Sequence, residues 1–217
     1  MTSNTFILSD GEEIPLIFEI RRDARNITLR PKTTPKREIH VSKPRWTPVF
    51  VALNFLEQKR NWIEKFFKNA PKKIKLQDGD TIVIFGEKMI ISQKELGGRP
   101  EFFERRLRDK IKEMFLARAK AIIKEVPKEF RPIKITVRDT SSRWGSCSTS
   151  GTISLSWRLA FAPPEIMRYV IIHELAHIKH MDHSPAFWAQ VSKLYGEGVG
   201  RAKLWLSKNG AELYKYF

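Results

Sequence analysis

VIIHELAHIKHMDH, residues 170–183, contains four of the five histidines of the chain. If this stretch is helical, His173 and His177 are separated by about 400° of rotation and about 6 Å of rise, so both imidazoles point from one face toward a common position. Two neutral imidazoles that converge in this way can bind a zinc ion. Glu174 lies on the flank of that face, where a carboxylate can reach a water on the metal without replacing it. The pattern therefore predicts a zinc site with Glu174 as a general base.

The same pattern has a structural alternative, which is a pair of core histidines satisfied by hydrogen bonds. The residues around and between the two histidines, from Tyr169 to Ile178, are otherwise mostly apolar, which indicates a buried helix. Polar side chains on a buried helix cost free energy unless they are paired or bind a ligand. We therefore favour the metal site over the structural alternative.

A hydrolytic zinc site needs a third protein ligand and leaves one position for water. The candidates in this sequence are His180, Asp182, His183 and the more distant Glu197. On one straight helix, His180 would lie about 10.5 Å along the axis from His173, so the three rings would converge poorly. Ser184-Pro185 is typical of the N-cap and first residue of a new helix, and a turn before it can direct His183 toward the metal. We therefore expect His183 to be the third ligand.

Composition limits the class of protein. A chain of 217 residues can form one domain with a sizeable core or two small ones. It has no apolar run long enough for a membrane helix, and its first residues lack the basic and apolar segments of a secretion signal. The single cysteine, Cys147, excludes an internal disulfide framework and fits a reducing compartment. We expect a cytoplasmic protein with no membrane partner.

The chain is strongly basic, with 40 Lys and Arg against 24 Asp and Glu and a net charge of +16. Such a charge favours contact with nucleic acid, anionic surfaces or acidic substrates through long-range attraction. Lysine-rich solvated surfaces give the same count, so the charge alone does not decide between these interpretations. A nucleic-acid-associated protein that acts on or recognises DNA-bound proteins is therefore an alternative function.

The first part of the chain is predicted to form a small sheet, a helix and a hairpin. Short β-prone segments at residues 6–8, 14–20, 26–30 and 38–41 indicate a small antiparallel sheet. His40, on the last of these segments, is expected to be a satisfied or exposed residue rather than a ligand. From Thr47 to Asn69, apolar residues recur at near-helical spacing, which predicts one amphipathic helix. Residues 81–85 and 89–91, separated by Gly86-Glu87-Lys88, predict a β-hairpin.

A domain boundary is predicted at the Gly-Gly-Arg-Pro segment, which divides the chain into residues 1–98 and residues 99–217. Residues 101–126 carry one apolar stripe among many charges and predict a long amphipathic helix that could back the metal helix. Residues 133–138 and 152–157 predict two strands, with a loop over residues 139–150 between them.

At this point the sequence resembles a known family. The segments 142–147, 152–159, 162–165 and 169–188 resemble the YgjP-like metallopeptidase family, which is similar to the SprT-like and WLM zinc proteases within the zincins. The resemblance implies one zinc ion held by His173, His177 and His183, with Glu174 as the catalytic residue. The extended metzincin motif is excluded because His180 stands where that motif has a glycine.

The resemblance also implies a fold and an activity. We expect an α+β chain with a strand-rich N-terminal part and a zincin-like lobe that contains an active-site helix, a backing helix and a small sheet. The expected activity is hydrolysis of peptide bonds in a protein or peptide substrate. In zincins an edge strand beside the cleft pairs with an extended substrate, and residues 152–157 are the expected edge strand.

Four further residues could contact the substrate. Tyr169, one helical turn before His173, and Arg143 are candidate donors to the oxyanion that forms during peptide hydrolysis. Trp144 and Gly145 are expected to shape the approach of the substrate to the site. Cys147 is expected to be a buried thiol rather than a nucleophile.

Overall fold

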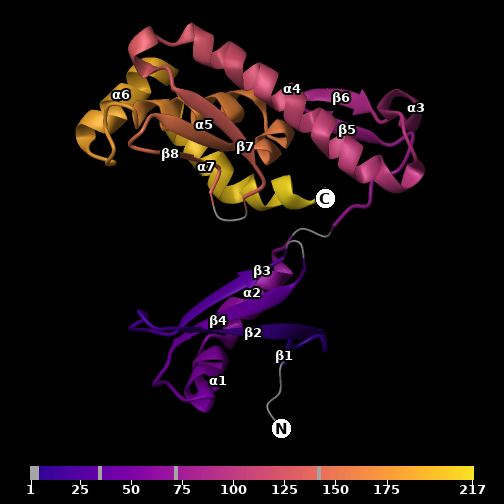
Figure 1. Ribbon diagram of the computed structural model, residues 1–217, viewed down its shortest axis with the longest axis vertical. Coiled ribbons are helices and arrows are strands. Elements are labelled where there is room, and N and C mark those ends of the chain that lie inside the picture. The colour runs from indigo at the N-terminus through magenta and orange to yellow at the C-terminus, as the bar shows by residue number, and fades with distance from the viewer. Residues whose placement is uncertain (1–4, 34–35, 71–72, 141–142) are drawn as a thin grey trace. The chain divides into compact units, whose positions relative to one another are not determined.

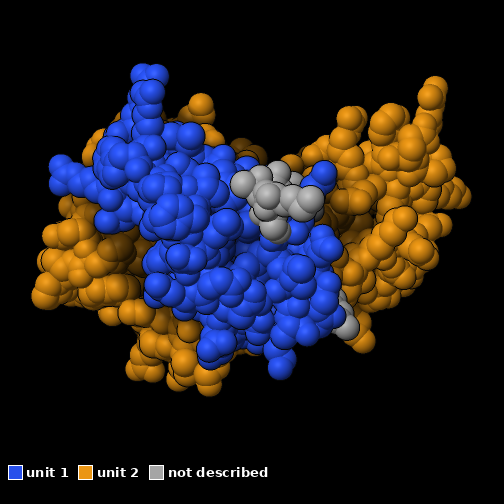
Figure 2. Space-filling view, turned by 90° about the horizontal axis from the view of Figure 1, so that it is seen from below, with its two compact units in different colours: residues 1–70 blue, residues 71–217 orange. Residues whose placement is uncertain are grey.

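The structure is a computed structural model that describes residues 5–33, 36–70, 73–140 and 143–217 (Figure 1). The chain divides into two compact units, Met1–Ala70 and Pro71–Phe217, which Figure 2 shows in different colours. We call them unit 1 and unit 2. The division into compact units places the predicted hairpin in unit 2, whereas the predicted boundary places it in residues 1–98. The domain boundary between residues 98 and 99 therefore stays a prediction.

Unit 1 is a four-stranded sheet with two helices. Its elements are β1 Thr5–Ile7, β2 Glu13–Arg21, β3 Thr28–Lys32, β4 Glu38–Pro44, α1 Val49–Gln58 and α2 Arg60–Lys68. The strand order is β1-β2-β4-β3. Ile14 on β2, Ile39 on β4 and Ile63 on α2 are completely buried, because the alternating side chains of the strands face the apolar stripes of the helices.

Two expectations for unit 1 are wrong. The sheet is not wholly antiparallel, because β4 pairs in parallel with β2 and antiparallel with β3. β4 has the longest buried run of the four strands, which explains its position between two neighbours. The predicted helix 47–69 is broken at Lys59, which allows Leu56 of α1 and Phe67 of α2 to reach the same core.

Unit 2 contains the remaining elements. They are β5 Thr81–Ile84, β6 Glu87–Ile90, α3 Gln93–Leu96, α4 Phe103–Glu125, β7 Lys134–Arg138, β8 Gly145–Cys147, β9 Thr152–Ser156, α5 Pro164–Ala176, α6 Pro185–Tyr195 and α7 Val199–Asn209, with short 3-10 turns at 100–102, 128–130, 157–161 and 210–214. The predicted hairpin is present as β5 and β6, and the predicted long helix is α4. In Figure 1, α4 runs along one side of unit 2, with the β5–β6 hairpin near its start.

The three-stranded sheet of unit 2 has the order β7-β9-β8. β9 pairs in parallel with β7 and antiparallel with β8. The segment 139–150 is therefore not a loop throughout, because Gly145–Cys147 forms a strand within it. As a result β9 lies in the middle of the sheet and β8 at its edge, which corrects the expectation that residues 152–157 form the edge strand.

The core of unit 2 surrounds α5. Leu107, Ile111 and Phe115 on α4 form one buried stripe, and the residues of α5 are buried on nearly every side. Trp157 is completely buried in the same cluster. The whole is a mixed α+β fold, as predicted. None of the helices in the described ranges is long and apolar enough to cross a membrane.

Candidate active site

The first two histidines lie at the end of α5. The helix begins with Pro164 at its first position and ends at Ala176, so His177 is its C-cap and keeps helical dihedral angles. The ring centroids of His173 and His177 are 5.0 Å apart. The Nδ1 atom of His177 lies 2.9 Å from the backbone carbonyl of His180, to which it can donate a hydrogen bond. This bond leaves Nε2 of His177 free to accept a metal.

The chain then turns and brings His183 back to the same place. Ser184 is the N-cap of α6 and its hydroxyl accepts the N–H of Phe187, while Pro185 is the first helical residue. The Nε2 atoms of His183 and His173 are 3.2 Å apart. One ligand atom from each of His173, His177 and His183 lies within 4.8 Å of the others.

The three histidines fit a metal ion chemically. Burial, with the charges of His177 and His183 adding to it, lowers the pKa of His173 to about 4. The imidazole of His173 is therefore neutral at physiological pH and can offer a lone pair. Its Nδ1 atom is buried without a hydrogen-bond partner in the described part of the chain. Three imidazole side chains this close together are a suitable donor set for a transition metal.

The other candidates for the third ligand lie outside this cluster. His180 contributes its backbone carbonyl to His177, and the grouping of ligand atoms does not include its side chain. Asp182 accepts the N–H of Ser184 and so holds the turn before α6. Glu197 belongs to no group of potential ligands among the described residues.

Glu174 is the buried carboxyl of the site. Glu174 is only 6% exposed. Burial raises the pKa of its carboxyl group to about 7, although the positive charge of Arg143 lowers this pKa. A carboxyl group with this pKa can both accept and return a proton near neutral pH. Gly145 of the edge strand lies directly against it, because a Cβ atom added at Gly145 would be 2.6 Å from Oε1 of Glu174.

The four residues expected near the substrate differ in their positions. The Tyr169 ring is 6.0 Å from that of His173, and burial raises the pKa of Tyr169 to about 12, so its hydroxyl stays protonated and can donate. Arg143 is exposed, and its positive charge lowers the pKa of Glu174. Trp144 packs on Tyr214, with ring centroids 5.3 Å apart, which gives it a structural role.

Two aromatic residues of α6 complete the surroundings of the histidines. Phe187 stacks on His177 with a centroid distance of 4.5 Å, and the Trp188 ring lies 5.7 Å from that of His183. Nζ of Lys203, on α7, lies 4.1 Å from the centre of the Trp188 ring. Sequence analysis did not single out Phe187, although its position three residues after the N-cap Ser184 could have indicated that α6 places it near His183.

Cys147 lies near the site but lacks the character of a nucleophile. Burial, with a contribution from the charge of Glu174, raises the pKa of its thiol. A raised pKa disfavours the reactive thiolate. These surroundings are consistent with the expectation that Cys147 is not a nucleophile, although the thiol is half-buried rather than buried.

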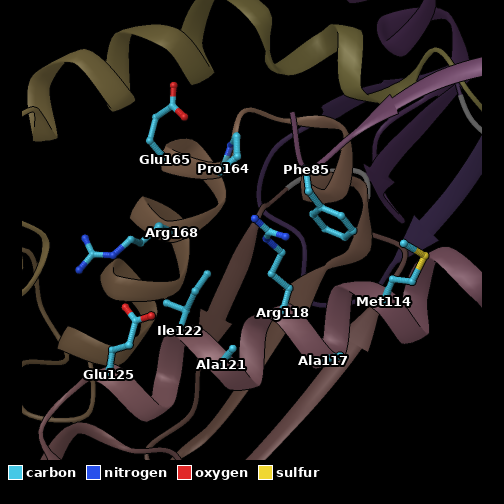
Figure 3. Close-up of a pocket in the computed structure, with 10 residues that line it drawn as sticks. All are labelled: Phe85, Met114, Ala117, Arg118, Ala121, Ile122, Glu125, Pro164, Glu165 and Arg168. Carbon is cyan, nitrogen blue, oxygen red and sulfur yellow. The ribbon is translucent and has the colours of Figure 1, made fainter. Parts of the chain in front are cut away.

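A hollow in the surface of unit 2 lies away from the histidines. It measures about 690 Å³ and lies between α4 and the start of α5 (Figure 3). Arg118 extends from α4 toward Phe85, and its guanidinium carbon is 5.3 Å from the centre of that ring. The three clustered histidines are absent from its lining, so the volume of this hollow says nothing about the candidate site.

Comparison with known proteins gives two results. A family model described as YgjP-like, metallopeptidase domain, matches residues 92–209. A solved structure, that of the metallopeptidase zymogen of Pyrococcus abyssi abylysin, is 31% identical over 48% of this chain and 97% of its own, with a TM-score of 0.35. No curated protein matches the chain.

Proposed function

Since the chain belongs to the YgjP-like metallopeptidase family, we propose that it is a zinc-dependent peptidase whose metal is held by His173, His177 and His183. One observation carries the proposal. Ligand atoms of three histidines lie within 4.8 Å of one another, and the buried carboxyl of Glu174 follows the first of them in the chain. The cluster offers three protein ligands and leaves a further position for water, as hydrolytic zinc sites do.

Zinc is the proposed metal because all three proposed ligands are imidazoles and because hydrolytic zinc sites have three protein ligands. Sites built from neutral imidazole suit zinc, copper, iron and nickel, whereas calcium and magnesium prefer oxygen ligands. When bound, zinc lowers the pKa of a coordinated water and polarises a carbonyl group. It requires no redox chemistry of the surrounding residues.

The residues of the chain have distinct proposed roles. Glu174 accepts a proton from the attacking water and then returns it to the leaving amine. Glu174 is only 6% exposed, so its carboxyl has little contact with bulk water. Tyr169 remains protonated because its pKa is raised to about 12, and its hydroxyl donates to the oxyanion of the substrate.

The substrate is proposed to lie along β8. Among the described strands, β8 pairs only with β9, so its other edge is available to an extended peptide. Gly145 starts this strand and lies against Glu174, which would bring the backbone of a paired peptide next to the carboxyl group. Backbone pairing gives affinity with little demand on the peptide sequence.

The test compares the wild type with Glu174→Gln. Both proteins are expected to bind one equivalent of zinc, measured by elemental analysis, because the histidines are unchanged. Cleavage of a peptide library should fall by about 100-fold or more in Glu174→Gln, since general base catalysis contributes about 10²–10⁴. Glu165→Gln is the matched control, because Glu165 is exposed on the same helix. Equal cleavage by the wild type and Glu174→Gln would contradict the proposal.

The identity of the metal needs a separate experiment. After removal of metal by a chelator, the protein is reloaded with zinc, cobalt, manganese or iron, and cleavage is measured for each. The proposal expects zinc to restore activity. The nucleic-acid alternative rests on the net charge of +16 alone, and salt-dependent DNA binding remains its test.

A further inference from the structure

A second hollow adjoins the histidine cluster. It measures about 380 Å³ and lies wholly within unit 2. His177, Ile178 and Met181 line one side, and the turn of residues 148–151 between β8 and β9 lines another, together with Ile133. His177 therefore belongs both to the proposed metal site and to the wall of this hollow. Whatever fills the hollow therefore contacts the wall that contains one of the proposed metal ligands.

The apolar wall of this hollow is unusually exposed. Ile133 is 86% exposed, more than any other large apolar residue in the described chain, and Met181 is 51% exposed. Single exposed apolar residues are common on protein surfaces and need no explanation. Here two of them meet at one concave place beside a candidate catalytic site, which is the usual setting of a ligand contact.

The backbone is shaped to keep Ile133 in this position. Gly151 has a φ of +75°, which favours glycine, and a Cβ atom there would lie 3.3 Å from two side-chain carbons of Ile133. The N–H of Ile133 donates to the carbonyl of Gly151, which fixes the two backbones together. The absence of a side chain at Gly151 leaves the Ile133 side chain in contact with the turn.

Several polar groups around the hollow hydrogen-bond to other groups of the protein. The hydroxyls of Ser148 and Ser150 are 2.8 Å apart and hydrogen-bond to each other, and Ser148 also accepts the N–H of Thr152. The guanidinium of Arg131 donates to two backbone carbonyls at the end of α4. No carboxylate is among the lining residues. The hollow thus offers a cationic side chain no carboxylate partner, and the apolar surface of Ile133, Ile178 and Met181 favours an apolar side chain.

The edge strand leads from the catalytic carboxyl to this hollow. β8 begins at Gly145, against Glu174, and ends at Cys147, directly before the turn that lines the hollow. An extended chain advances about 3.3 Å per residue. A peptide paired along β8, with its reacting carbonyl near Glu174, therefore reaches the hollow about two or three residues further on.

We propose that this hollow is a substrate subsite that selects a large apolar side chain, such as Leu, Ile, Met or Phe, about two or three residues from the cleaved bond. The inference rests on the proposed peptidase function. At about 380 Å³ the hollow falls within the range of about 300–1,000 Å³ for ligand pockets, so it has room for a large apolar side chain.

The test profiles the cleavage sites of a peptide library by mass spectrometry with full-length, zinc-loaded protein. The wild type should show enrichment of large apolar residues at one position two or three residues from the cut, as the β8 geometry requires. Ile133→Ser and Met181→Ser should lose this enrichment, with kcat/KM for the preferred peptide reduced by roughly 10-fold or more. Ile90→Ser is the matched control, because Ile90 is 69% exposed in the same unit and does not line the hollow.

The outcomes separate the two proposals. If the wild type cleaves and both serine variants keep its profile, the subsite is wrong and the peptidase stands. If neither the wild type nor Glu174→Gln cleaves any peptide, the peptidase function fails. In that case the hollow is tested by binding, with fluorescein-labelled Gly-Ser peptides that carry a single Leu or a single Asp. Equal dissociation constants for the two peptides, or a Leu preference that survives Ile133→Ser, would overturn the inference.

Discussion

Replacing Gly145 with alanine should separate catalysis from metal binding. The new Cβ atom would lie 2.6 Å from both Cγ and Oε1 of Glu174, closer than carbon and oxygen atoms can approach, and 2.7 Å from Cδ. Because Glu174 is only 6% exposed, its side chain has little room to retreat without losing its place. A displacement of about 1 Å at a catalytic group can cost about 100-fold in rate. The strain should lower the free energy of unfolding by about 1–3 kcal/mol.

The assay measures kcat/KM for peptide cleavage, zinc content and urea unfolding in parallel. Gly145→Ala is expected to lose about 100-fold in kcat/KM while it keeps its zinc, because the added methyl group faces Glu174 and not the histidines. Gly200→Ala is the matched control, since no atom beyond its chain neighbours and the backbone of its own helix lies within 4 Å of its added Cβ. On α7 this control should be neutral or more stable by up to about 1 kcal/mol. Full activity of Gly145→Ala, or loss of its zinc, would refute the reasoning.

Two further predictions concern the histidines. Zinc at a concentration 100-fold above its dissociation constant should stabilise the wild type by about 2.7 kcal/mol in a thermal unfolding assay; His183→Ala should lose most of this gain and His180→Ala should keep it, whereas an equal loss in both would contradict the ligand assignment. In unit 1, hydrogen bonds from His40 to Glu19 and Glu38 raise the pKa of His40 above 6.5 and lower the pKa values of both carboxyls below 4.5. The stabilisation by His40 is therefore complete below pH 6.5 and is lost as the pH rises through its folded pKa, while the stabilisation by the carboxylates is lost as the pH falls below 4.5. The difference in unfolding free energy between metal-free wild type and metal-free His40→Gln should shrink between about pH 5.5 and about pH 9, and a constant difference would refute the prediction.

The features that sequence could predict are local. The apolar stripe of residues 101–126 predicted α4, and Ser184-Pro185 predicted both the start of α6 and the turn that carries His183 toward His173. Each of these depends on residues within a few helical turns of one another. Helical periodicity and capping residues are therefore sufficient to identify them.

The features that sequence missed depend on distant parts of the chain. A strand of three residues such as β8 is too short to show alternation, and its pairing with β9 decides which strand is the edge. The close approach of Gly145 to Glu174 is a contact between the sheet and α5. No sequence pattern in either segment predicts this contact. The break at Lys59 contains neither proline nor glycine, and it follows from the shared core of α1 and α2.

The short edge strand also disfavours aggregation between molecules of this protein. A sheet edge that accepts a foreign peptide can equally accept a strand from another molecule, which leads to aggregation. β8 offers only three residues, too few to hold two sheets together, and β7 at the opposite edge begins with Lys134 and ends with Arg138, both exposed. Like charges on these residues would meet if two β7 edges came together. The sheet can thus bind a peptide transiently at β8, while the formation of a stable β-sheet polymer is disfavoured.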